Sequence, residues 1–135
     1  MNRICLLASA ALAVLVAPTF AWAETATVTS GTKAQITTHM RFDNSCNAIP
    51  VVIELLAKPA NGTVTVESKD IVVRPATPRG GEQPSPCVGK SVAGVAVFYQ
   101  SKSGFAGQDS FRYRRTSESR GDRSSGEISF TVTVK

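Results

Sequence analysis

From residue 24 onwards, apolar and polar residues alternate with a period of two, and Gly, Pro and Asn separate the alternating runs. This period places successive side chains on opposite faces of a strand. The runs predict strands at Thr25–Thr29, Ala34–Phe42, Val51–Ala57, Thr63–Glu67, Asp70–Arg74, Val92–Gln100, Ser110–Thr116 and Glu127–Val134. Short strands at this spacing, without a helical run, predict an all-β domain built as a β-sandwich of about seven strands.

The pattern also assigns faces and connections. In the run Ala34–Phe42, strict alternation places His39 on the polar face, so we expect a surface histidine. Val51–Ala57 is apolar on both faces apart from Glu54, which is typical of a central strand. Asn61-Gly62 predicts a tight turn, and a second turn is expected at Ser68-Lys69. Pro75 to Lys90 is rich in Pro and Gly and predicts a long loop.

The N-terminus has the three parts of a secretory signal. Arg3 precedes an uncharged apolar run from Ile4 to Val16, and Ala21-Trp22-Ala23 supplies small residues at the two positions that a signal peptidase reads. Residues 1–23 are therefore predicted to be a cleaved signal peptide, and 24–135 to be the mature domain. The alternative is a membrane anchor, but the apolar run is about 13 residues and a spanning helix needs roughly 20. We expect a periplasmic or secreted protein.

Two cysteines remain after cleavage, Cys46 and Cys87. An even number of cysteines in an exported chain predicts a disulfide. The alternative is a pair of free or metal-binding thiols, but two distant cysteines with a single histidine make a poor zinc site. The Cys46–Cys87 bond would close a long loop, which stabilises the fold by on the order of 4 kcal/mol in the chain-entropy view.

Positive charge gathers near the C-terminus. The mature chain carries 14 Lys and Arg against 10 Asp and Glu, a net charge of +4. The candidate anion-binding residues are Arg112, Arg114, Arg120 and Arg123. Arg112 and Arg114 share one face of a strand, and the other two are expected in the hairpin loop after that strand. Arginine binds phosphates and sulfates through two hydrogen bonds at once. The simpler interpretation is a solvated edge that prevents aggregation between sheets.

The C-terminal half carries a resemblance. The run Tyr99-Gln-Ser-Lys-Ser-Gly-Phe-Ala-Gly-Gln-Asp-Ser-Phe-Arg-Tyr113 resembles the closing signature of bacterial Ig-like and cadherin-like repeats, which are strung together in large surface adhesins. Lys58-Pro-Ala-Asn-Gly-Thr-Val64 is also similar to those repeats. The resemblance covers roughly Val51 to Lys135 and implies an Ig-like β-sandwich. In physical terms, Gly104 and Gly107 allow a bend between sheets, and Asp109 can accept hydrogen bonds from loop amides.

The departures from those repeats restrict what the resemblance implies about function. The calcium-binding acids common there are replaced by Thr116-Ser-Glu-Ser-Arg-Gly-Asp-Arg123, and this chain has a single copy, a disulfide and a Pro-rich insertion. The fold carries over, but it does not imply an adhesin role. His39 is the only histidine and has no nucleophile context, and no carboxylates are spaced for paired acid-base work or calcium.

We therefore expect a non-catalytic binding or structural module of the cell envelope, with no cofactor and no metal. Its expected partner is an unknown protein or an anionic glycan or lipid, and no specific nucleic acid is expected. The alternatives are an inhibitor or accessory subunit of an envelope or secreted enzyme, and a polyanion binder that uses the Arg-rich hairpin.

Overall fold

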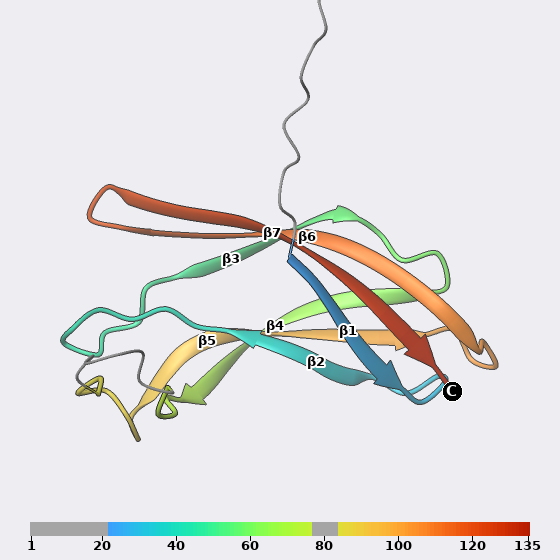
Figure 1. The fold of residues 1–135 in the computed structure, drawn as a ribbon, viewed down its shortest axis with the longest axis horizontal. Helices are drawn as coiled ribbons and strands as arrows, with labels where there is room; N and C mark the ends of the chain where they lie inside the picture. The colour runs from blue at the N-terminus through green and yellow to red at the C-terminus, as the bar shows by residue number, and fades with distance from the viewer. Residues whose placement is uncertain (1–21, 77–83) are drawn as a thin grey trace, which may run out of the picture.

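The computed structural model describes residues 22–76 and 84–135, with side chains from Ala23 onwards. It contains seven strands: β1 (Trp22–Val28), β2 (Ala34–His39), β3 (Val51–Ala57), β4 (Gly62–Val72), β5 (Ser91–Ser101), β6 (Gly107–Ser119) and β7 (Asp122–Val134). They form a four-stranded sheet in the order β1-β7-β6-β3 and a three-stranded sheet in the order β2-β5-β4. The two sheets stack as a β-sandwich, and the β6–β7 hairpin projects away from the three-stranded sheet (Figure 1). The prediction of an all-β sandwich is confirmed.

Six of the seven strands follow the order of an Ig-type sandwich, and the first strand, β1, lies in the other sheet. The orders β2-β5-β4 and β3-β6-β7 match strands B-E-D and C-F-G of that fold. The first strand pairs in parallel with β7 instead of lying beside β2, with Val28 opposite Val134. This match concerns the chain topology alone and does not by itself identify a family.

The main core lies between the sheets and confirms the alternation predicted for the last two strands. Phe111 and Tyr113 of β6 are buried while Arg112 between them is exposed. In β7 the buried residues are Ile128, Phe130, Val132 and Val134. The rings of Phe111 and Phe130 stack with centroids 5.5 Å apart. The hairpin thus supplies the aromatic centre of the sandwich.

A smaller second core surrounds the predicted disulfide. Cys46 and Cys87 are bonded, with Cα atoms 5.4 Å apart. Cys87 is fully buried and packs with Val73 and Val92. The carboxylate of Asp43 accepts hydrogen bonds from backbone amides nearby and holds the turn in which Cys46 has a φ of 66°. The bond therefore ties the β2–β3 connection to the residues preceding β5, as the sequence predicted.

Three predictions about individual strands are wrong. The predicted break at Ser68-Lys69 does not exist, because β4 runs without interruption and its register against β5 is continuous. The predicted central strand, β3, lies at the edge of its sheet, where Val52 is 62% exposed. His39 is buried and is not on the surface, because the register of β2 against β5 shifts between Gln35 and Thr37. An extra residue in a strand turns every later side chain to the opposite face.

Two predicted segments fall largely or partly outside the described residues. Residues 1–21 of the expected signal peptide are not described, and neither are residues 77–83 of the Pro-rich loop. Cleavage before Glu24 remains a prediction, and it would leave the residues of β1 from Glu24 onwards, which pair with β7 from Phe130. The described part of the chain contains no helix that could span a membrane.

Candidate anion-binding surfaces

The Gly-Phe-to-Tyr run forms a structural corner where the chain passes from β5 to β6. Gly104 and Gly107 have φ values of 79° and 134°, a region that favours glycine. The buried carboxylate of Asp109 accepts hydrogen bonds from the Tyr99 hydroxyl at 2.8 Å and from the amides of Ala60 and Asn61 at 3.0 and 2.9 Å. Asp109 thus joins both sheets and the β3–β4 connection, which confirms the role expected for it.

Hydrogen bonding controls the ionisation of Asp109. Burial by itself would raise the pKa of this carboxyl, but the bonds from Tyr99, Asn61, Ser110 and Ala60 outweigh burial and hold the pKa below its ordinary value. Burial, followed by the hydrogen bond to Asp109 and the negative charge of this carboxylate, raises the pKa of the Tyr99 hydroxyl. The carboxylate stays charged and serves as an internal acceptor, which leaves it unsuited to bind a ligand.

The hairpin arginines (Arg112, Arg114, Arg120 and Arg123) do not form one cluster. Arg120 and Gly121 make a two-residue turn with φ values of 50° and 81°, as a tight hairpin requires. Arg123 lies in β7 opposite Glu118, and not in a loop. Arg112 and Arg114 share the outer face of β6 as predicted, but Arg112 is about 26 Å along the strand from Arg120 at the usual rise per residue.

Acidic neighbours neutralise the middle of this surface. Arg114 forms ion pairs with Glu127 of β7 at 2.8 Å and with Glu54 of β3 at 3.2 Å. These contacts, the one to Glu127 first, raise the pKa of Arg114. Asp122 lies at the hairpin end and pairs with Arg41 at 3.4 Å. The remaining arginines are exposed but separated, so the hairpin fits an extended polyanion better than a single small anion.

His39 occupies an internal position that the sequence did not reveal. Its Nε2 lies 2.7 Å from the hydroxyl of Tyr113 across the sandwich, and the two rings meet edge to face. Burial, followed by the positive charge of Arg115, lowers the pKa of His39 to about 4. The ring is therefore neutral at pH 7, and it holds the two sheets together.

A cleft opens beside this pair at the edge where β1 and β2 face each other. Its volume is about 470 Å³. It is lined by Glu24, Thr37, Thr38, His39, Arg115, Ser125, Gly126, Glu127 and Ile128. Arg115 is its only cation among these lining residues, and two of them are carboxylates. The carboxylates outnumber the cation, so this cleft does not favour an anion.

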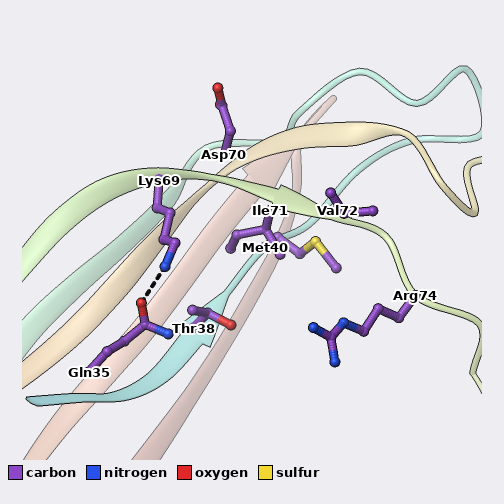
Figure 2. A pocket seen from close by; sticks show the side chains of 8 residues that line it. All are labelled: Gln35, Thr38, Met40, Lys69, Asp70, Ile71, Val72 and Arg74. Carbon is purple, nitrogen blue, oxygen red and sulfur yellow. Dashed lines mark hydrogen bonds between the residues drawn. The ribbon is translucent and has the colours of Figure 1, made fainter.

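A second hollow, of about 550 Å³, lies on the three-stranded sheet. It opens on the face turned away from the other sheet, because Thr38 alternates with the inward-facing His39. We call it the outer hollow. Its lining residues are Gln35, Thr38, Met40, Lys69, Asp70, Ile71, Val72 and Arg74 (Figure 2). It therefore joins residues of β2 with those at the end of β4 and just beyond.

The outer hollow combines an apolar floor with cations. Met40 and Ile71 lie at its centre, the Lys69 ammonium donates a hydrogen bond to the Gln35 side chain, and the Arg74 guanidinium points inward, while the Asp70 carboxylate points away (Figure 2). Because Gly94 of β5 has no side chain, Ile71 can pack directly against the backbone of β5; a Cβ added at Gly94 would lie 2.6 Å from Ile71 Cδ1. The outer hollow thus offers two cations, and the one carboxylate among its lining residues does not face inward.

The sequence did not predict the outer hollow because a turn was expected at Ser68-Lys69. Had β4 been recognised as one strand, alternation would have placed Lys69 and Ile71 on the same face. Within the described ranges, no group of three or more His, Cys, Asp or Glu side chains is arranged to hold a metal ion. No protein family model and no curated protein matches this chain. The resemblance to Ig-like and cadherin-like repeats therefore stays a prediction.

Proposed function

We propose that the mature chain is an exported, non-catalytic binding module of the cell envelope, and that its ligand carries negative charge. The observation that carries this proposal is the outer hollow, where Lys69 and Arg74 border the apolar floor made by Met40 and Ile71. Two cations beside apolar surface suit an amphiphilic anion, such as a lipid headgroup with its first methylenes or an acidic glycan with an apolar sugar face.

Two further features support the proposal, one for the absence of catalysis and one for export. The hydrogen-bond partner of His39 is the Tyr113 hydroxyl, and not a serine or cysteine, so the histidine is used for packing. Export is supported by the signal-like N-terminus and by the disulfide, a bond that persists in oxidising compartments.

A second candidate surface is the hairpin. Arg112, Arg120 and Arg123 are exposed, and none forms an ion pair within the described part of the chain. They would serve a polyanion long enough to reach from the face of β6 to the hairpin turn. The inhibitor or accessory-subunit alternative would use the basic hairpin or the Pro-rich loop, and this loop begins directly after Arg74 at the border of the outer hollow.

Binding to vesicles tests the proposal. The mature protein should bind phosphatidylglycerol vesicles or dextran sulfate more tightly than phosphatidylcholine vesicles, with affinity falling as salt rises. Arg74→Gln should weaken binding several-fold and reduce the slope of log affinity against log salt by about one. Arg112→Gln removes one exposed arginine elsewhere and is the matched control. Loss of binding only in Arg112→Gln would indicate that the hairpin, and not the outer hollow, is the binding surface. Equal binding to the anionic probes and to phosphatidylcholine vesicles would refute the proposal that the ligand is anionic.

A further inference from the structure

The outer edge of β4 is long and uncovered. β4 is the last strand of the three-stranded sheet, and no described strand pairs with its outer side. Every residue from Thr65 to Asp70 is exposed, so both faces of this stretch contact solvent. Val66 and Val72 are 43% and 54% exposed. An edge of this length without proline or bulge is a template on which another strand can pair.

The pairing with β5 determines which backbone groups of β4 point outward. Just beyond its two ends, the Val73 amide donates to the Lys90 carbonyl, and the Lys102 amide donates to the Asn61 carbonyl. Bonded and non-bonded residues alternate along an antiparallel ladder, so the odd-numbered residues of β4 bond to β5. The even-numbered residues therefore direct their N–H and C=O groups to the outer edge: Gly62, Val64, Val66, Ser68, Asp70 and Val72.

This alternation restricts how two copies of β4 could pair antiparallel about a twofold axis. Outward-pointing residues must face each other, so the axis must pass through a residue and not between two residues. An axis at Glu67 would place two carboxylates opposite each other, and an axis at Lys69 would oppose two ammonium groups. Like charges directly opposite each other are destabilising. An axis at Ser68 instead places Glu67 of each copy opposite Lys69 of the other.

We propose that the protein forms a twofold dimer by antiparallel pairing of β4 edges centred on Ser68, which joins the two three-stranded sheets into one. In this register Val72, which is 54% exposed, faces the partly buried Val64 of the other copy, and Val66 faces Asp70. Glu67 already pairs with Lys33 in its own chain, and Lys69 with Gln35. A carboxylate has two acceptor oxygens and an ammonium three donors, so these bonds can be kept alongside the new ones.

Cross-linking tests both the dimer and its register. Residues that face each other in a bonded antiparallel pair have Cα atoms about 5.5 Å apart, which a disulfide can bridge. Ser68→Cys should therefore give a covalent dimer under mild oxidation. Thr65→Cys is the matched control, because it is exposed on the same strand but lies about 20 Å from its counterpart in this register. Equal cross-linking of both variants, or of neither, would overturn the proposal.

A charge swap provides an independent readout. One strand against one strand is a small interface, so we expect a dissociation constant on the order of micromolar in sedimentation experiments. Glu67→Lys and Lys69→Glu should each weaken the dimer at least several-fold, and the double variant should restore it. Glu67 and Lys69 are exposed in both copies, so we expect the variants to have the same melting temperature as the wild type. A monomer at every concentration up to about 1 mM, or a double variant as weak as the single ones, would refute the pairing.

Discussion

Replacement of Asp109 by alanine removes the carboxylate that ties both sheets to the β3–β4 connection. Asp109 is 6% exposed, and it accepts the Tyr99 hydroxyl and the amides of Ala60 and Asn61 within 3.0 Å. Alanine would leave these three donors without that acceptor. Each buried polar group without a partner costs about 1–3 kcal/mol. Because water can reach some of them, we expect a loss of about 3–6 kcal/mol, a large share of a typical domain stability of about 5–15 kcal/mol.

Thermal unfolding followed by circular dichroism would measure this loss. For a domain of this size, 1 kcal/mol lowers the Tm by about 4 °C, so Asp109→Ala should lower it by about 12–25 °C. Tyr99→Phe removes only one of the bonds and should cost about 1 kcal/mol. Glu118→Ala, an exposed carboxylate on the same strand, is the control and should change stability by less than about 0.5 kcal/mol.

The pH dependence gives the decisive result. The pKa of Asp109 is lowered in the folded protein, so its stabilisation is complete above the unfolded pKa of about 3.9 and is lost as pH falls through the folded value. The stability difference between wild type and Asp109→Ala should therefore shrink at low pH. An Asp109→Ala variant that loses less than Tyr99→Phe, or a difference that stays constant down to about pH 2, would refute the role assigned to this carboxylate.

Three other measurements would test the disulfide, the signal peptide and the buried histidine. Cys46→Ser should destabilise the protein by about 4 kcal/mol, measured by denaturant unfolding, and free thiols in protein taken from an oxidising compartment would contradict the bond. Mass spectrometry of the envelope fraction should find Glu24 as the first residue, whereas an intact Met1 in a membrane fraction would exclude cleavage. The lowered pKa of His39 means that stability should fall as pH drops from about 6.5 to 4, and His39→Gln should remove this part of the pH dependence. Two-dimensional NMR that finds His39 titrating near pH 6.5 would contradict its burial.

The parts of the fold that the sequence predicted are those where one strand face meets the core. In β6 and β7 the alternation is visible because Phe111 and Phe130 pack inward while their neighbours meet solvent. The disulfide was predictable because the expected signal cleavage removes Cys5 and leaves two cysteines in an exported chain. Asp109 was recognised because a carboxylate beside two glycines at a corner has few physical uses other than accepting loop amides.

The errors have a common physical cause, since each depended on a neighbouring strand. No glycine or proline lies near Ile36, so nothing in the sequence indicated the bulge there. The bulge turns His39 into the core, where its ring nitrogen forms a hydrogen bond with the Tyr113 hydroxyl. β4 looked like two strands and a turn because a sheet edge with both faces in solvent shows no apolar period around Ser68. β3 looked central because it is apolar, yet Val52 faces solvent.

The net charge of a sheet surface depends on which residues the neighbouring strands place beside each other, and this cross-strand register is not visible in the local sequence. Five arginines within twelve residues predicted a basic surface, but the strand spreads them out, and the register brings Glu54 and Glu127 against Arg114. The outer hollow is formed by residues that are distant in the sequence. Lys69 and Gln35 are 34 residues apart, and they come together only because β4 and β2 flank β5. Local density of charge in a β-protein therefore overstates a binding surface wherever neighbouring strands carry acids. It misses a surface whose lining comes from different strands, as the outer hollow joins Thr38 of β2 with Lys69 of β4, and this is why the outer hollow, and not the hairpin, is the first surface to test.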